Sequence, residues 1–131
     1  VRAALADAGM EGRTVGYVNA HGTSTPENDK MEWLALSTVF GDAMKSIPVS
    51  SNKSMIGHTL SAAGAIEAAF SLMTMREGFL PPTINYDQPD PAIEIDCVPN
   101  KGRSADVATV LSNSFGFGGQ NTCLVMGREP V

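Results

Sequence analysis

Histidine occurs at only two positions in this chain of 131 residues, His21 and His58. Each stands in a stretch of small and polar residues, since His21 begins the string HGTSTP and His58 ends the string NKSMIGH. The pair lacks the spacing to other histidine, cysteine or aspartate residues that is typical of a zinc site. Two imidazoles that donate to one oxygen atom suit decarboxylation or attack on a thioester, in which negative charge develops on that oxygen.

The first string follows the mostly apolar run Val15–Ala20, which predicts a short strand. A histidine at the carboxyl end of a strand is well placed to meet a substrate in an open α/β sheet. The hydroxyls of Thr23 and Thr25 can donate to amide or carbonyl groups of a long ligand. The alternative is a turn in which these hydroxyls satisfy only local backbone groups.

The second string leads into a predicted helix over Ser61–Arg76, so that His58 lies just before a helix N-terminus. Protonation is disfavoured there, which makes a neutral imidazole that donates a hydrogen bond the expected form. Glu67 can pair with Lys53 if the loop folds back onto the helix. The alternative is an ordinary capped helix start with a solvated lysine.

The third polar segment is Asn113–Asn121, which places three glycines around Phe115 and Phe117. Its backbone can pass close to a ligand, its N–H groups could form an oxyanion hole, and a phenylalanine between glycines could swing as a gate. A phosphate cradle is disfavoured because no Lys-Ser/Thr follows, as it would in a P-loop. A glycine-rich bulged hairpin is the structural alternative.

Strands and helices alternate along the rest of the chain, which predicts an α/β layer structure. We expect a helix from Arg2 to about Gly9, and another that Asn28 or Asp29 caps and Gly41 ends. The apolar face of the second is expected at Met31, Leu34, Ala35, Thr38 and Val39. Short strands are expected at Ile47–Val49 and Ile93–Ile95, and a closing pair at Val107–Asn113 and Thr122–Met126. The small residues of the Ser61–Arg76 helix predict that it is buried, with Ile66, Ala69, Phe70 and Met73 on one face.

The composition of the chain excludes several classes of protein. Hydrophobic residues make up 43% and charged residues 18%, which excludes wholesale disorder. The net charge of −5 argues against a nucleic-acid partner, and no apolar run is long enough to span a bilayer. The start, VRAAL, has neither an initiator methionine nor a signal-peptide pattern, which indicates the interior of a longer chain. Two cysteines without a disulfide framework favour a reducing, cytoplasmic setting.

Four strings, in this order, resemble the β-ketoacyl-[acyl-carrier-protein] synthases, most of all their type II members: HGTSTPENDKMEW, VSSNKSMIGHTLSAAGAIEA, PPTINYDQPDP and NSFGFGGQN. The resemblance runs from about Arg2 to Met126. It implies the thiolase-like fold, an α/β/α/β/α arrangement of two similar halves. Residues 1–131 resemble the C-terminal half alone.

The resemblance also implies roles for individual residues. His21 and His58 would be the two histidines of a Cys-His-His triad, and Lys53 would pair with Glu67. Contacts to substrate would come from Thr23, Thr25, Phe115, Phe117 and Gly118, with Phe117 as the mobile gate of the acyl pocket. No metal is required, although some members hold a structural monovalent cation at positions that match Asn19, Glu67, Ser112 and Asn113.

The nucleophilic cysteine of the family belongs to the N-terminal half, where a helix dipole lowers its pKa. Neither cysteine of this chain has that setting. Cys97 stands where the family usually has an aromatic or apolar residue, and Cys123 lies in the last predicted strand, where it is expected to be a small core residue.

The implied activity is a decarboxylative condensation of an acyl thioester with malonyl-carrier protein in fatty acid elongation, without a cofactor. The implied partners are acyl carrier protein, the N-terminal half and a second copy in a homodimer, and this chain is expected to be inactive alone. Two alternatives stay open, a non-catalytic partner of the chain-length-factor kind and a ketosynthase of a polyketide or nodulation system.

Overall fold

The computed structural model describes residues 1–128, and its centre is a four-stranded sheet in the order β2-β1-β5-β6. The strands are β1 (Tyr17–Asn19), β2 (Val49–Ser50), β5 (Thr109–Gly116) and β6 (Gln120–Gly127). Strand β1 runs parallel to both β2 and β5, whereas β5 and β6 form an antiparallel hairpin. The α/β class and the closing strand pair predicted from the sequence are confirmed.

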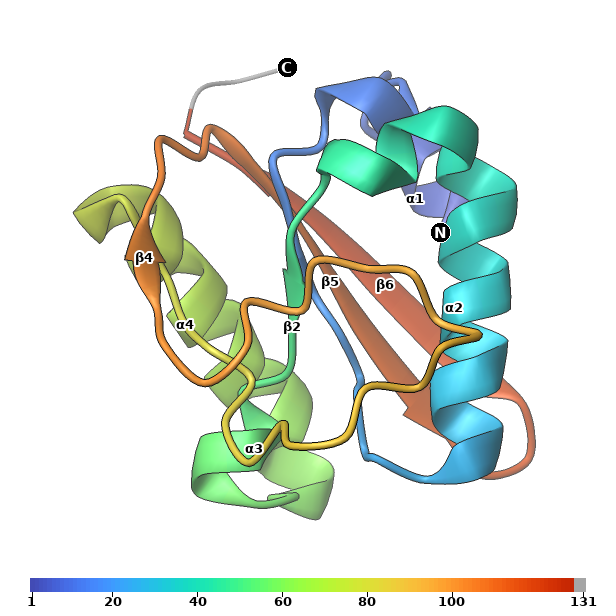
Figure 1. Cartoon of the computed structure of the whole chain (residues 1–131). Helices are drawn as coiled ribbons and strands as arrows, with labels where there is room; N and C mark the ends of the chain where they lie inside the picture. The colour runs from blue at the N-terminus through green and yellow to red at the C-terminus, as the bar shows by residue number, and fades with distance from the viewer. Residues whose placement is uncertain (129–131) are drawn as a thin grey trace.

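Helices cover both faces of this sheet (Figure 1). On one side lie α1 (Arg2–Asp7) and α2 (Pro26–Phe40), and on the other lies α4 (Ala63–Glu77), preceded by the short α3 (Lys53–Ile56). A second, two-stranded sheet pairs β3 (Phe79–Leu80) with β4 (Arg103–Ser104) near the end of α4. Three 3-10 helices, Gly12–Thr14, Gly41–Ser46 and Leu60–Ala62, complete the connections.

Two apolar clusters hold these layers together, one on each face of the sheet. The first packs α1 and α2 onto the strands through residues such as Leu5, Leu36 and Leu111. The second packs α4 onto the other face through Tyr17, Met75 and Val110. Because alternate residues of a strand point to opposite faces, Val110 and Leu111 of β5 contribute to different clusters.

Helix α2 differs from the prediction in its start and in its buried face. It begins at Pro26 rather than near Asn28, because the Thr25 hydroxyl accepts a hydrogen bond from the Asn28 N–H at 3.2 Å and proline suits the first helical position. The predicted face is wrong, since Met31 and Leu34 are 58% and 53% exposed. The buried positions are Glu32, Leu36 and Phe40, four residues apart.

Helix α4 begins two residues later than predicted, after a 3-10 turn. Its buried residues are Ala63, Glu67, Ser71, Thr74 and Met75, whereas Met73 of the predicted apolar face is exposed together with Leu72. The helix is therefore buried on one face only within residues 1–128.

The crossing from β3 to β4 was predicted to hold a strand at Ile93–Ile95, and this is wrong, because those residues form no ladder. The polar stretch predicted as a loop after Ile47–Val49 contains the end of β2 and the α3 turn. Across residues 1–128, no helix combines the length and the apolar character needed to cross a membrane.

Candidate active site

The residues singled out in the sequence come together at one edge of the main sheet. Strands β1 and β2 are parallel, so their carboxyl ends meet there, and the chain leaves β1 into His21 and β2 into Lys53. Strand β5 runs parallel to β1 and carries Asn113 and Phe115 to the same edge. This is the edge at which open α/β sheets bind their ligands.

The two histidine rings lie against each other. Their centroids are 5.6 Å apart and the ring planes meet at 84°, an edge-to-face arrangement. Phe115 packs on His21 from β5 with a centroid distance of 5.5 Å. The two histidines, which are 37 positions apart in the sequence, therefore form one site.

His21 is held as a neutral ring. Burial lowers the pKa of His21 to about 4, and the neighbouring Lys53 and His58 act in the same direction. Its Nδ1 is buried without a hydrogen-bond partner among residues 1–128. A neutral imidazole at physiological pH has one N–H to donate, which is the form an oxyanion site requires.

His58 is exposed and its tautomer is set by the backbone. Its Nδ1 accepts a hydrogen bond from the Leu60 N–H at 3.1 Å, at the turn that leads into α4. Because Nδ1 acts as an acceptor, the neutral ring carries its proton on Nε2. Both histidines can thus present an N–H toward a third atom.

Lys53 and Glu67 form the ion pair predicted from the sequence. The Lys53 ammonium donates to Oε1 of Glu67, and the two side chains are only 5% and 1% exposed. Burial raises the pKa of Glu67, and the lysine opposes that effect. A buried pair of this kind fixes geometry, since the loss of either partner leaves an uncompensated charge.

Glu32 was not predicted from the sequence to belong to this site. Its two carboxylate oxygens accept hydrogen bonds from the backbone N–H groups of His21 and Gly22, each at 2.9 Å, and Oε1 also accepts one from the Asn113 side chain at 3.1 Å. The carboxylate thereby ties α2 to the His21 loop and to β5. The signal for it was an acidic residue in line with Leu36 and Phe40 on the buried stripe of α2.

The four positions predicted to hold a monovalent cation are all buried. Asn19 donates to Ser112 at 3.0 Å and accepts from Asn52 at 2.8 Å. Within residues 1–128, Glu67 Oε2 and Asn113 Oδ1 are buried oxygen atoms without a hydrogen-bond donor. Such oxygens fit a cation that takes oxygen ligands. Residues 1–128 contain no cluster of three His, Cys, Asp or Glu side chains that could hold a metal.

The remaining substrate-contact candidates lie around this centre. The Thr23 and Thr25 hydroxyls are 3.5 Å apart, and Thr25 also caps α2. Phe117 is fully exposed at the tip of the β5–β6 hairpin. Gly118 follows it at a φ of 82°, which glycine adopts without strain.

Neither cysteine has the setting of an activated nucleophile. Burial is the main cause that raises the pKa of the thiol in both Cys97 and Cys123, so both favour the uncharged form. Cys97 is a buried residue of the crossing from β3 to β4, and Cys123 packs partly buried against the core cluster under α2.

Comparison with known proteins decides the family. Residues 1–87 match the family described as "Beta-ketoacyl synthase, C-terminal domain". The chain belongs to the β-ketoacyl synthases. A 3-oxoacyl-[acyl-carrier-protein] synthase 2 of Coxiella burnetii is 50% identical over 124 residues, and one of Staphylococcus aureus is 48% identical over 125. Each alignment covers 95% of this chain but only 30% and 31% of the relative.

Solved structures of this family share the fold. A β-ketoacyl synthase from Burkholderia phymatum superposes with a TM-score of 0.91 at 41% identity over 98% of this chain and 31% of its own. A ketosynthase in complex with its type II polyketide acyl-carrier protein gives a TM-score of 0.94 at 42% identity, over 97% and 31%. The thiolase-like fold is confirmed, and the chain spans about a third of the length of the proteins that it matches.

Proposed function

We propose that this chain supplies the two histidines of a Cys-His-His site in a 3-oxoacyl-[acyl-carrier-protein] synthase, an acyltransferase of fatty acid elongation in the cytoplasm. The observation that carries the proposal is the contact of His21 and His58, two rings 5.6 Å apart that can both donate an N–H. The identity to two 3-oxoacyl-[acyl-carrier-protein] synthases supports it.

In the proposed reaction, malonyl-carrier protein loses carbon dioxide and its thioester becomes an enolate. Both imidazole N–H groups would donate to the thioester oxygen, where the charge from the broken carbon–carbon bond accumulates. The enolate carbon then attacks the acyl carbonyl and forms the new carbon–carbon bond. The carbon–sulfur bond to the cysteine breaks, and the cysteine sulfur leaves as a thiolate. The product is β-ketoacyl-carrier protein.

Four sets of supporting residues complete the proposed site. The Lys53–Glu67 pair and Glu32 would keep the two histidine loops in place, and Thr23 and Thr25 would contact the arm of the carrier protein. Asn19, Glu67, Ser112 and Asn113 would hold a monovalent cation, which supplies positive charge that fixes these loops. Phe117 would gate the acyl pocket, beside Phe115 and Gly118.

The proposal requires partners, because the nucleophilic cysteine is outside this chain. We place it in an N-terminal half that packs on the exposed side of α4, with the intact enzyme as a homodimer. An acyl carrier protein would deliver both substrates, as supported by the related ketosynthase that was solved with its own.

The test is to replace each histidine by alanine in the full-length enzyme and to measure two half-reactions. Loss of one oxyanion donor should slow malonyl decarboxylation by about 10²–10³-fold. Acylation of the cysteine should suffer less, because a helix dipole keeps that thiol reactive without the histidines. Equal losses in both half-reactions would contradict this division of roles.

A second candidate, a non-catalytic partner, has support from a related structure of a ketosynthase with a chain length factor, which is 42% identical with a TM-score of 0.92. The retained histidines and the buried Lys53–Glu67 pair favour the enzyme. The presence or absence of condensation by the full-length protein without a second subunit separates the two candidates.

A further inference from the structure

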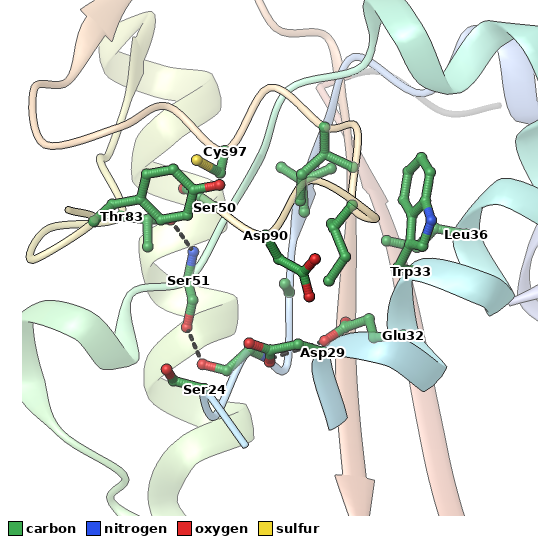
Figure 2. A pocket seen from close by; sticks show the side chains of 16 residues that line it. Ser24, Asp29, Glu32, Trp33, Leu36, Ser50, Ser51, Thr83, Asp90 and Cys97 are labelled. Atoms are coloured by element: carbon green, nitrogen blue, oxygen red, sulfur yellow. Dashed lines mark hydrogen bonds between the residues drawn. The ribbon is translucent and has the colours of Figure 1, made fainter. Parts of the chain in front are cut away.

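A cavity of about 180 Å³ lies behind the His21 loop, between α2 and the crossing segment, which is residues 81–100. Figure 2 shows Trp33 and Leu36 of α2 along one wall and Cys97 of the crossing segment opposite. Neither histidine lines it, and it adjoins the site described above at Gly22 and Glu32. We call it the crossing cavity.

The walls of the crossing cavity are mostly apolar. Trp33, Leu36 and Val49 face Ile93, Ile95 and Cys97, and Tyr86 adds a second aromatic ring. An apolar cavity of about 150 Å³ in a protein core takes up benzene, so this volume suits one six-membered ring with a short substituent. The volume and the apolar lining of the crossing cavity therefore fit a small aromatic molecule.

The charged residues of its lining are all acidic. They are Asp29, Glu32 and Asp90, and no lysine or arginine lines the cavity. The Glu32 carboxylate accepts hydrogen bonds from two backbone N–H groups. Asp29 accepts one from the Asn28 side chain at 3.1 Å and Asp90 one from the Ala92 N–H at 2.9 Å, and neither makes an ion pair within residues 1–128. In Figure 2 the Asp90 carboxylate points from the crossing segment toward the end of α2 that carries Asp29. This charge favours a cation at the mouth and repels an anion.

We propose that the crossing cavity is a binding site for a small aromatic ammonium, with the ring between Trp33 and Tyr86 and the cation at Asp29 and Asp90. Aromatic faces and carboxylates together stabilise such a cation. The ligand would lie on a hydrogen-bonded seam, in which Ser51 N–H donates to Thr83 at 3.0 Å and Ser51 Oγ donates to Gly22 O at 2.7 Å. The seam joins the crossing segment to the loops of both histidines.

Calorimetric titration of the full-length protein tests the proposal with three probes that each carry a phenyl ring on a short chain. 2-Phenylethylammonium should bind with a Kd on the order of 1 mM, as expected for nine heavy atoms in a small site. The neutral 2-phenylethanol should bind about tenfold more weakly, since it loses the charge pairing, and 3-phenylpropionate more weakly still. Absence of saturable ammonium binding, or an anion that binds as tightly, would overturn the proposal.

Two substitutions locate the binding. Asp90→Asn should weaken ammonium binding several-fold and leave the alcohol unchanged, while the matched control Asp87→Asn, an exposed aspartate outside the cavity, should change neither. Cys97→Phe should fill the cavity and abolish binding of all probes, with condensation activity unchanged. Ile93→Phe fills it from the same segment if Cys97→Phe does not fold. Probe binding that survives in a folded filled variant would refute the site, without bearing on the proposed activity.

Discussion

Single residues of this site support the His21 loop without occupying the His21 ring. Lys53 is the one lysine near His21, and its ammonium is paired with Glu67 in the interior. Glu32 reaches the same loop only through backbone N–H groups and leaves the His21 ring free. The imidazoles can therefore act as hydrogen-bond donors while the nearby charges serve as supports.

The first prediction concerns the titration of His21. Its pKa of about 4 in the folded protein lies below the ordinary value of 6.5, so the unfolded chain binds a proton that the folded chain does not between these values. Folding stability should therefore fall as the pH drops through this window. Imidazole NMR shifts of the full-length enzyme should show His21 neutral at pH 5.5.

A double substitution serves as the control for this titration. Lys53→Met with Glu67→Gln removes the cation without leaving a buried carboxylate unpaired. The pKa of His21 should then rise but stay below 6.5, because burial is the largest cause of its depression. A His21 that titrates near 6.5 in the unaltered enzyme would contradict the buried, neutral ring.

The second prediction concerns Glu32. Gln has one acceptor oxygen where the carboxylate offers two, so Glu32→Gln places an amide N–H against a backbone N–H of the His21 loop. We expect a loss of about 1–3 kcal/mol in the free energy of unfolding, together with a lower condensation rate. Glu27→Gln, an exposed position on the first turn of the same helix, is the control and should leave both unchanged. Equal effects of the two substitutions would show that only helix charge matters.

At the scale of the elements, local sequence signals predicted those helices and strands that pack against other segments of this chain. Strand β1, the β5–β6 pair and most of α4 follow from apolar runs and glycine breaks. The Lys53–Glu67 pair was expected only if the loop folds back onto the helix, as it does, and from the family resemblance. The face of α2 could not be predicted, because Met31 and Leu34 are exposed while Glu32 is buried for its hydrogen bonds. A polar residue buried for a loop contact resembles a surface residue in a hydropathy pattern.

The third prediction concerns the β5–β6 hairpin. Phe117 lies exposed between Gly116 and Gly118, whereas Phe115 packs on the His21 ring. Phe117→Ala should leave the unfolding free energy within about 0.5 kcal/mol, since no core contact is lost, and should change the kinetics of acylation. Phe115→Ala, the matched control, should lower the melting temperature through the lost ring contact. A large melting drop for Phe117→Ala with normal kinetics would make it a packing residue.

At the scale of the whole molecule, residues 1–128 expose ten large hydrophobic side chains, and Leu60 on the turn before α4 is 75% exposed. Large exposed apolar patches mark contacts with other protein surfaces. The α4 side of the sheet, with Leu72 and Met73, is the surface on which we place the missing half.

The last prediction follows from that surface and from the cysteines. This chain alone, incubated with acyl- and malonyl-carrier protein, should give no β-ketoacyl product, because neither thiol has a pKa lowered toward thiolate. Addition of a separately produced N-terminal half should restore turnover, since the two histidines then face its cysteine. Replacement of α4 surface residues, as in Leu72→Asp with Met73→Asp, should prevent that restoration, whereas Glu77→Gln at the exposed end of the helix should not. Robust turnover by the chain alone would disprove the need for a second half.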